Sequence, residues 1–494
     1  MTQSTLHLKI KKKNTMMYDV IIVGSGVAGL QCALNLDRKL TKLIICKDEP
    51  TECNTSYAQG GIAVSIDKDD IQSHIEDALR AGAGLCSKEA VEVLCYESRI
   101  CIDDLIKSGF VFDKDSVGSL HYTKEGAHSR HRVLHAGGDR TGRVLEEFLL
   151  SHSNAHMLQN SSVSDIYIED GICKGIEICR DGEFDTINCS CLVLAFGGVG
   201  SIFGFHTNSK TVNGQLTGLC SRRGFTLKNM EMTQFHPTVF VDNNWVRKLL
   251  LSEALRGEGA KIVDRSGYAF LKEYDIREEL ASRDIISRAI YEHSYRYNTS
   301  AYLDLSSFSK EYFKVRFPFI YENLTKLGYN PPKDPVPISP AFHYTVGGIA
   351  TNLFGQTHTY SNVYAIGECA YSGVHGGNRL ASNSLLEGLV FGKRAALHIN
   401  DNFTKLEASR LSFSKKEWKK DDDAEVKKLI RDTMWNKCGI VRTKNGLDDA
   451  KKTLANIDVE RIGFDVECRL EAAKTIIKQA IDRGGSIGAH FIKN

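Results

Sequence analysis

The sequence predicts an α/β fold: a Rossmann-like nucleotide-binding domain with an inserted α+β capping domain, followed by a C-terminal helical domain. Three observations predict this organisation. Near the N-terminus a β-branched run leads into a glycine-rich turn and then into an apolar-periodic segment, in the order strand, turn, helix. Two more apolar runs ending in glycines occur much later, and the last part of the chain has helical spacing. The chain of 494 residues is also too long for one hydrophobic core.

The first strand and helix lie in "YDVIIVGSGVAGLQCALNL", residues 18–36. Gly24, Gly26 and Gly29 form the pattern G-x-G-x-x-G between them. The first glycine makes the turn, the second lets a pyrophosphate approach the backbone, and the third lets the helix pack on the strand. The helix N-terminus adds N–H donors. A glycine turn in another α/β fold is the alternative, but the context favours a dinucleotide site.

The second strand is predicted in "TKLIIC", residues 41–46. An NAD-binding domain normally places an acid for the ribose near its end, and here Cys46 and Lys47 follow instead, which disfavours a pyridine nucleotide. Residues 191–200 and 361–373 read as further strands that end in glycine turns. We therefore expect one sheet assembled from distant segments.

The composition changes along the chain and suggests domain boundaries. Residues 230–344 carry more aromatic and charged residues and end in the proline cluster "NPPKDPVPISP", which indicates the inserted capping domain. The nucleotide-binding domain then comprises 16–229 and 345–402. Helical spacing in "AEVKKLIRDTMW" and "RLEAAKTIIKQAI" assigns 403–494 to the helical domain, and the basic leader 1–15 is expected to be disordered.

Composition excludes several classes of protein. Lys plus Arg number 63 and Asp plus Glu 61, so the net charge of +2 gives no sign of a nucleic-acid partner. No apolar run approaches the roughly 18–20 residues of a membrane span. The 14 cysteines include no C-x-x-C pair, so zinc and iron–sulfur sites are disfavoured and a reducing cytoplasm is expected.

Polar residues among glycines mark a candidate site in four stretches and one helix. A lone histidine is more often structural than catalytic, and one arginine of the set could simply pair with Glu278 or Glu279 on a solvated helix face. Together, however, two histidines and several arginines suit a dicarboxylate, because arginine binds carboxylates bidentately and stays charged. The set comprises Gln234, His236, Ser252, Glu253, Arg256, Arg283, His343 and Arg379, with Ser384 and Leu385 after the last arginine.

These motifs resemble the flavoprotein superfamily of L-aspartate oxidase, fumarate reductase and succinate dehydrogenase. The resemblance runs from Tyr18 to the C-terminal helices. The motifs "GSGVAG", "SYAQGGIA", "QFHPT", "EALRGEGA", "SRD", "HYTVGGIATN", "YAIGE" and "HGGNRLASNSLLE" occur in the family's order. Three positions depart from the family pattern: Phe196 replaces a threonine, Asn213 replaces an aspartate near the ribose, and Ile487 replaces an arginine.

The resemblance implies FAD as the cofactor. The linking histidine of fumarate reductase and succinate dehydrogenase aligns with Asn54, which cannot form that bond, so the FAD is expected to be non-covalent. By resemblance the cofactor contacts are Gly24, Ser25, Gly26, Val27, Ala28, Gly29, Lys47, Asn54, Thr55, Ser56, Tyr57, Ala58, Gln59, Gly60, Gly61, Asn213, Glu368, Ser384 and Leu385.

Two features resemble the oxidase rather than its respiratory relatives. One is the spelling "SYAQGG". The other is Glu125 in "YTKEGAHSRHRVLHAGG", whose carboxylate suits a substrate with an ammonium group; the alternative is a solvated loop glutamate beside Lys124. His128, His131 and His135 also invite a metal interpretation through helical spacing. We expect no metal, because the family uses none and no cysteine joins them.

The resemblance implies FAD-dependent oxidation of L-aspartate to 2-iminosuccinate, with reduction of O2 to H2O2 or of fumarate, as the first step of NAD biosynthesis through quinolinate. His236, His343 and Arg379, with Gln234 and Ser252, would bind C4 dicarboxylates; Arg283 would be the acid/base group, relayed by Glu253 and Arg256, with Glu125 reading the amino group. Quinolinate synthase is a possible functional partner. A soluble fumarate reductase and a catalytically silent flavoprotein interaction module are the alternatives.

Overall fold

The computed structural model describes residues 16–241 and 248–493, so the predicted leader lies outside the described residues. A seven-stranded sheet forms the centre of the nucleotide-binding domain, in the order β6-β2-β1-β9-β8-β7 with β16 also paired to β9. Its strands are β1 (Met17–Val23), β2 (Lys42–Ile45), β6 (His156–Leu158), β7 (Ser162–Glu169), β8 (Ile172–Arg180), β9 (Glu183–Leu194) and β16 (Val363–Ala365). The predicted α/β class, with one sheet built from distant segments, is confirmed.

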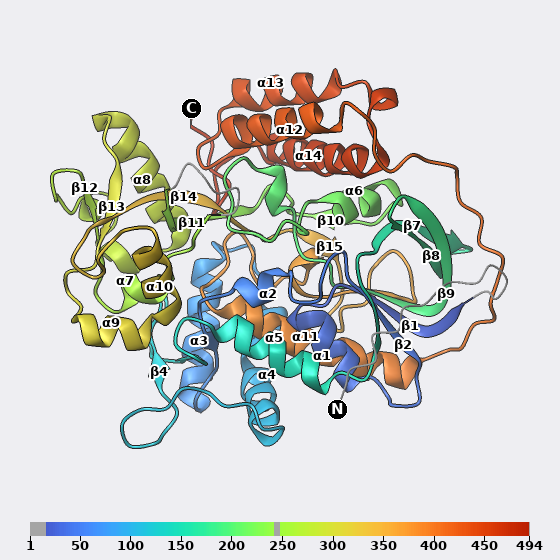
Figure 1. Cartoon of the computed structure of the whole chain (residues 1–494), viewed down its shortest axis with the longest axis horizontal. Coiled ribbons are helices and arrows are strands. Elements are labelled where there is room, and N and C mark those ends of the chain that lie inside the picture. Colours follow the sequence, from blue (N-terminus) through green and yellow to red (C-terminus); the bar gives the residue numbers. More distant parts are fainter. Residues whose placement is uncertain (1–15, 242–247, 494) are drawn as a thin grey trace.

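The parallel part of this sheet positions the site. Strands β1, β2, β6, β9 and β16 are parallel neighbours, so their carboxyl ends meet at one edge. Gly24, Lys47, Ala195 and Glu368, which follow four of these strands, gather there. The helices α1 (Val27–Asn35), α3 (Lys68–Ala81), α4 (Lys88–Lys107), α5 (Thr141–His152) and α11 (Asn383–Asn402) lie below the sheet edge in Figure 1.

The capping region is a four-stranded antiparallel sheet surrounded by helices, drawn in yellow-green to gold in Figure 1. Its strand order is β11-β14-β13-β12. The strands are β11 (Thr233–Phe240), β12 (Lys261–Asp264), β13 (Ala301–Asp304) and β14 (Val336–Thr345); the helices are α7 (Glu253–Gly257), α8 (Arg283–Tyr297), α9 (Lys310–Arg316) and α10 (Pro318–Lys326). The pairing of β11 with β14 is irregular in two places, and both irregularities lie at predicted site residues.

Three helices form the C-terminal bundle: α12 (Asp423–Cys438), α13 (Lys444–Ala455) and α14 (Phe464–Arg483). The two helices predicted from spacing are confirmed, and α13 is additional. Residues 403–420 are not helical, contrary to the expectation of a helical region from 403, because they run as an extended segment along the sheet. There Leu406 N donates to Ser190 Oγ at 2.9 Å and Ser409 N to Asn188 Oδ1 at 2.9 Å.

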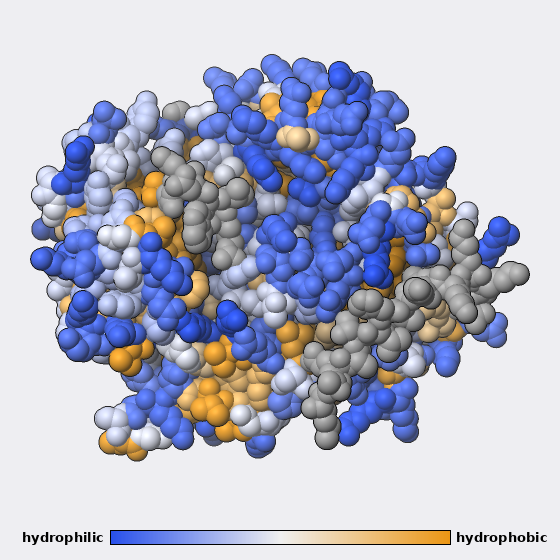
Figure 2. All heavy atoms as spheres, viewed as in Figure 1, coloured by the Kyte–Doolittle hydropathy of each residue, from blue (hydrophilic) through white to orange (hydrophobic). Residues whose placement is uncertain are grey.

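The bundle is amphipathic, as its composition predicts. Hydrophilic residues cover its outer surface in Figure 2. Its inner face forms one apolar cluster with Phe203, Phe235 and Phe342, which joins the bundle to the capping sheet. No helix among residues 16–241 and 248–493 is long and apolar enough to cross a membrane.

Short elements complete the chain. Two three-stranded sheets have the orders β3-β5-β4 and β10-β15-β17. The remaining α-helices and strands are α2 (Asn54–Tyr57), β3 (Ile62–Ala63), β4 (Tyr122–Thr123), β5 (Val133–Leu134), α6 (Gln215–Arg222), β10 (Leu227–Lys228), β15 (Gly348–Ala350) and β17 (Ala370–Tyr371).

Candidate active site

A cleft with about 1110 Å³ of empty space lies at the carboxyl edge of the parallel strands. Of the predicted cofactor contacts, twelve line it: Gly24, Ser25, Gly26, Val27, Ala28, Lys47, Asn54, Thr55, Asn213, Glu368, Ser384 and Leu385. Gly29 does not line this cleft, nor does Ser56. Residues 57–61 face a second cavity instead.

The shape of this cleft fits a dinucleotide. Gly24 has φ +115°, and a β-carbon there would lie 2.2 Å from Ala195 O, so only glycine allows the turn. A β-carbon on Gly29 would lie 2.2 Å from Gly24 O, so this glycine lets α1 pack on the turn. Helices α1 and α11 both begin without a side-chain cap, and both first turns face the cleft. At α1 the Thr55 hydroxyl accepts from Val27 N at 3.0 Å, which fixes this residue of the cofactor segment beside the helix start. The N-terminus of a helix suits phosphate and flavin oxygens through its N–H groups and its dipole.

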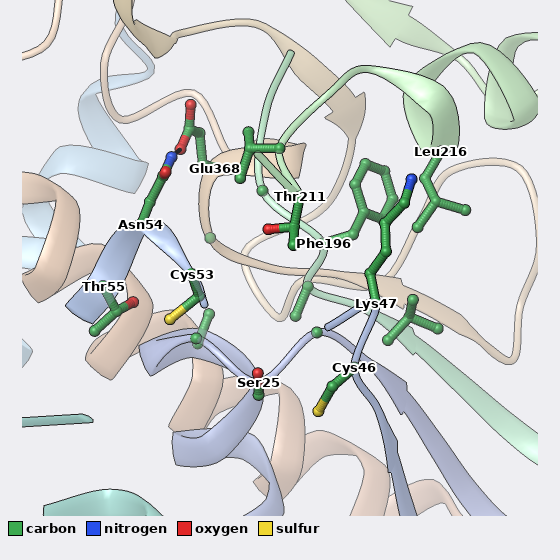
Figure 3. Close-up of a pocket in the computed structure, with 18 of the residues that line it drawn as sticks. Ser25, Cys46, Lys47, Cys53, Asn54, Thr55, Phe196, Thr211, Leu216 and Glu368 are labelled. Carbon is green, nitrogen blue, oxygen red and sulfur yellow. Dashed lines mark hydrogen bonds between the residues drawn. The ribbon is translucent and has the colours of Figure 1, made fainter. Parts of the chain in front are cut away.

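Asn54 holds three segments of the cleft wall together. Its Nδ2 donates to Asn208 Oδ1 and to Glu368 Oε2, both at 3.2 Å, and its Oδ1 accepts from Ser209 N at 2.9 Å. Figure 3 shows Asn54 and Glu368 pointing toward each other across one side of the cleft. Burial raises the pKa of Glu368 to about 7, although the hydrogen bonds from Thr345 N and Asn54 oppose the rise.

The opposite end of the cleft is polar. Lys47 Nζ donates to Asn213 Oδ1 at 3.3 Å and to Gln215 Oε1 at 3.4 Å. Asp465, on α14 of the C-terminal bundle, lies 3.6 Å from the same Nζ. The bundle therefore reaches the cofactor cleft. Gln215 was not among the predicted cofactor contacts, although it lies two residues after Asn213 and lines the same cleft.

A second cavity, with about 770 Å³ of empty space, adjoins the cleft. Four residues line both: Asn54, Glu368, Ser384 and Leu385. The predicted substrate-site residues that it brings together are Glu125, His236, Ser252, Glu253, Arg283, His343 and Arg379. Gln234 and Arg256 lie immediately behind, each bonded to a lining residue.

Two arginines bracket Glu253. Arg283 Nε donates to Glu253 Oε2 at 2.5 Å, and Arg256 Nη2 lies 3.3 Å from Glu253 Oε1. Burial would raise the pKa of Glu253, but the two arginines outweigh it and hold that pKa below its usual value. Arg283 Nη1 also donates to Gln234 Oε1 at 3.0 Å. The alternative that Arg283 pairs with Glu278 or Glu279 on a solvated helix face is wrong. Both glutamates form ion pairs with Lys261 instead.

The two histidines occupy the two irregular points of the capping sheet. His343 has no partner between Tyr344, opposite Gln234, and Phe342, opposite Phe235. A second register shift follows His236, where Pro237 lacks an N–H. Such bulges re-aim side chains, and here the two imidazole rings lie 5.2 Å apart.

Both histidines are neutral hydrogen-bonding groups. Burial and then Arg283 lower the pKa of His236 and of His343 well below the usual value. Thr238 N donates to His236 Nδ1 at 3.3 Å, so the neutral ring carries its proton on Nε2. His343 Nδ1 bonds to Thr207 Oγ1 at 2.8 Å.

Arg379 differs from Arg256 and Arg283 in that it forms no ion pair with any described residue. It is buried, its Nε has no hydrogen-bond partner, and its guanidinium lies 4.2 Å from the ring centroid of Tyr344. Burial, followed by the charge of Arg283, lowers its pKa to about 10. The Tyr344 hydroxyl donates to Glu387 Oε2 at 3.1 Å. The Tyr344 ring thus packs against the guanidinium of Arg379, a contact that was not predicted from the sequence.

Glu125 is buried, so the alternative of a solvated loop residue is wrong. Its Oε2 accepts from Ser382 Oγ at 2.6 Å, while its Oε1 has no partner. The next residue, Gly126, packs closely against Glu253, because a β-carbon on Gly126 would lie 2.2 Å from Glu253 Oε1. Burial and the charge of Glu253 raise the pKa of Glu125, while Ser382 and Arg283 lower it.

The three nearby histidines do not form a cluster. The expectation that these histidines have helical spacing is wrong, because the stretch consists of a loop and strand β5 and contains no helix. His128 Nε2 bonds to Ala381 O at 3.0 Å, His135 Nε2 to Thr123 Oγ1 at 2.8 Å, and His131 is exposed. Within the described part of the chain, no group of three or more His, Cys, Asp or Glu residues is placed to hold a metal ion.

Comparison with known proteins identifies relatives over most of the chain. The FAD binding domain family matches residues 19–385. The L-aspartate oxidase of Bacillus subtilis is 42% identical over 77% of this chain and 71% of its own length. L-aspartate oxidase 1 of Ralstonia nicotianae is 37% identical over 97% of this chain and 96% of its own length. An E. coli quinol fumarate reductase structure superposes with a TM-score of 0.88 at 26% identity, covering 98% of this chain and 92% of the other.

Proposed function

The chain belongs to the L-aspartate oxidase family of FAD-binding flavoproteins, and on this premise we propose that it oxidises L-aspartate to 2-iminosuccinate. FAD is the cofactor, and the enzyme is a flavin-dependent oxidoreductase. The proposal concerns the substrate, the residue roles and the electron acceptor.

The charge pattern of the second cavity is the observation that carries the proposal. L-aspartate has two carboxylates and one ammonium group. The cavity presents Arg379 and Arg283 with two histidines, and it also presents Glu125, whose Oε1 is buried without a partner. A succinate or fumarate dianion has no group for that carboxylate, whereas the ammonium of aspartate does.

FAD, when bound in the adjoining cleft, supplies the redox chemistry by accepting the two electrons of the substrate. The protein residues orient the substrate. Arg379, His343 and His236 bind its carboxylates, with Ser252 at the cavity wall and Gln234 supporting Arg283. Glu125 binds the amino group, which fixes the carbon that bears nitrogen.

Arg283 is the residue we assign to proton exchange with the substrate. An arginine is an unusual base, because its ordinary pKa is far above neutrality. Its contacts provide a relay for the proton: the side chain is buried, lines the cavity, and donates from Nε to Glu253 Oε2 at 2.5 Å. Arg256, behind Glu253, can share the charge of that carboxylate as the proton moves.

The electron acceptor and the pathway follow from the same proposal. Oxygen would be reduced to H2O2, or fumarate to succinate, and the unstable imine would feed quinolinate synthase in NAD biosynthesis. A cytoplasmic location is supported by the cysteines, because all fourteen lie in the described part of the chain and are free thiols. A soluble fumarate reductase is the second candidate, because the fold matches the fumarate reductase flavoprotein closely.

The test is anaerobic mixing of the holoprotein with L-aspartate while the flavin absorbance is followed. We expect bleaching by L-aspartate and recovery on admitting air, with H2O2 and the hydrolysis product of iminosuccinate formed in equal amounts. Reduction by succinate but not by aspartate would refute the proposal and support the second candidate.

A further inference from the structure

Ser382 is in an unusual position for a serine. It precedes α11 with φ 58° and ψ 2°, a left-handed conformation that a non-glycine residue seldom adopts. Serine in this place usually caps its helix by accepting a backbone N–H bond, but here there is no side-chain cap. Its hydroxyl instead donates to Glu125 Oε2 at 2.6 Å. The hydroxyl of Ser382 therefore does not cap α11 and instead binds Glu125.

That bond leaves Glu125 with one free oxygen. Oε1 is buried and accepts no hydrogen bond, although the backbone N–H of Gly61 lies near enough to the carboxylate to lower its pKa. A β-carbon built on Gly60 would lie 3.3 Å from this Oε1 and 3.6 Å from Ser382 Oγ. A small group placed above Gly60 would therefore contact the side chains of both Glu125 and Ser382. No cationic side chain of the described residues hydrogen bonds to Oε1.

Neighbouring bonds hold the two residues in place. His128 Nε2 bonds to the carbonyl of Ala381 at 3.0 Å, which joins the Glu125 loop to the residue before Ser382. Ala63 N donates to Ser382 O at 3.1 Å, and Ala127 N donates to Leu280 O at 3.1 Å. Backbone hydrogen bonds therefore fix the positions of Glu125 and Ser382. They come from Ala63, which follows the predicted cofactor contacts 54–61, and from Leu280 of the capping region.

We propose that Ser382 is a positioning residue that confers selectivity for an amino substrate: by binding one oxygen of Glu125, it presents the other to an ammonium group in the space above Gly60. This inference rests on the proposed function. A hydroxyl that donates to a carboxylate favours its charged form, which an ammonium requires. Burial and Glu253 act against that form, so the hydroxyl opposes both.

The test compares Ser382→Ala with Ser382→Gly in the FAD-loaded enzyme. Both remove the hydroxyl, but glycine also relieves the left-handed backbone, so a purely conformational role predicts opposite results for the two variants. The measurement is the ratio of kcat/KM for L-aspartate oxidation to kcat/KM for fumarate reduction with a reduced dye. We expect both variants to lower the ratio about tenfold to a hundredfold.

Two further variants sharpen the comparison. Ser164→Ala is the matched control, because Ser164 also donates to a carboxylate, Glu177, at 2.6 Å in a buried site, but lines neither cavity. Its ratio should equal that of the wild type. Gly60→Ala should lower the ratio, because its methyl group occupies the space beside Glu125 Oε1.

The outcomes separate the inference from the proposed function. A lowered ratio in both Ser382 variants supports the inference. An unchanged ratio in both, or a wild-type ratio in Ser382→Gly alone, overturns it while leaving aspartate oxidation intact. A wild-type enzyme that does not oxidise L-aspartate overturns the proposed function and the inference together.

Discussion

Replacing Arg379 by leucine tests whether this cation is retained for binding rather than for folding. The fall of its pKa from 12.5 to about 10 corresponds to a free-energy cost of about 3 kcal/mol for keeping the charge inside the protein. At neutral pH the arginine is charged in the folded and the unfolded chain, so this cost destabilises the fold. The Tyr344 ring, 4.2 Å away, returns about 1–2 kcal/mol by a cation–π interaction.

Arg379→Leu removes both terms, so the FAD-bound variant without substrate should be as stable as the wild type or more stable by about 1–2 kcal/mol. Activity should change in the opposite direction. Losing a charged clamp on a buried carboxylate costs about 3–5 kcal/mol, which is a hundredfold or more in kcat/KM for L-aspartate. Succinate should raise the melting temperature of the wild type but not of the variant.

Arg132 provides the matched comparison. It is fully buried but is bonded to Asp70 at 2.8 Å and to Asp77 at 2.6 Å. Arg132→Leu leaves the buried Asp70 without an ion-pair partner and Asp77 with Arg80 alone, so it should destabilise the protein by about 3–5 kcal/mol. The assays are thermal unfolding with and without succinate, and steady-state kinetics at equal flavin content. An Arg379→Leu variant as destabilised as Arg132→Leu, or one that still oxidises aspartate normally, would refute the reasoning.

Three other predictions concern single residues. Glu125→Gln should lower L-aspartate oxidation roughly ten- to a hundredfold while sparing fumarate reduction, because a bond to a charged group contributes about 1.5–3 kcal/mol; an unchanged ratio of the two activities would contradict this. Because Asn54 cannot link to flavin, denaturation and filtration should separate all FAD from the polypeptide, and retained yellow colour would count against the prediction. Glu368 has its folded pKa raised to about 7 from 4.5, so it binds more protons folded than unfolded, and the stability it contributes is lost as pH rises through that pKa. Glu368→Gln should therefore flatten the fall in melting temperature of the FAD-free protein between pH 5 and 8, and a fall as steep as in the wild type would exclude this assignment.

Much of the site could be predicted from the chain because its motifs are local. The turn at Gly24, Gly26 and Gly29 needs only neighbouring residues to specify strand, turn and helix. Other residues escaped notice for a physical reason. Tyr344 follows His343 in a strand and reads as a core residue, and only the cation–π contact with Arg379 gives it a role. Ser382 reads as part of a polar run, since its partner Glu125 is 257 positions away.

The amino-acid sequence by itself determined the α/β class, the FAD-binding turn and the set of polar residues, because hydrophobic period, glycine turns and residue types act over short stretches of chain. Tertiary structure alone decided the arrangement of that set. The bulges at His236 and His343 arise from pairing two strands that are far apart in sequence, so the inward direction of both rings depends on that pairing. Whether Arg283 meets a solvated glutamate or the buried Glu253 depends on how the capping helices dock. The pKa values follow from the same packing, because burial and opposing charge exist only once distant segments have come together.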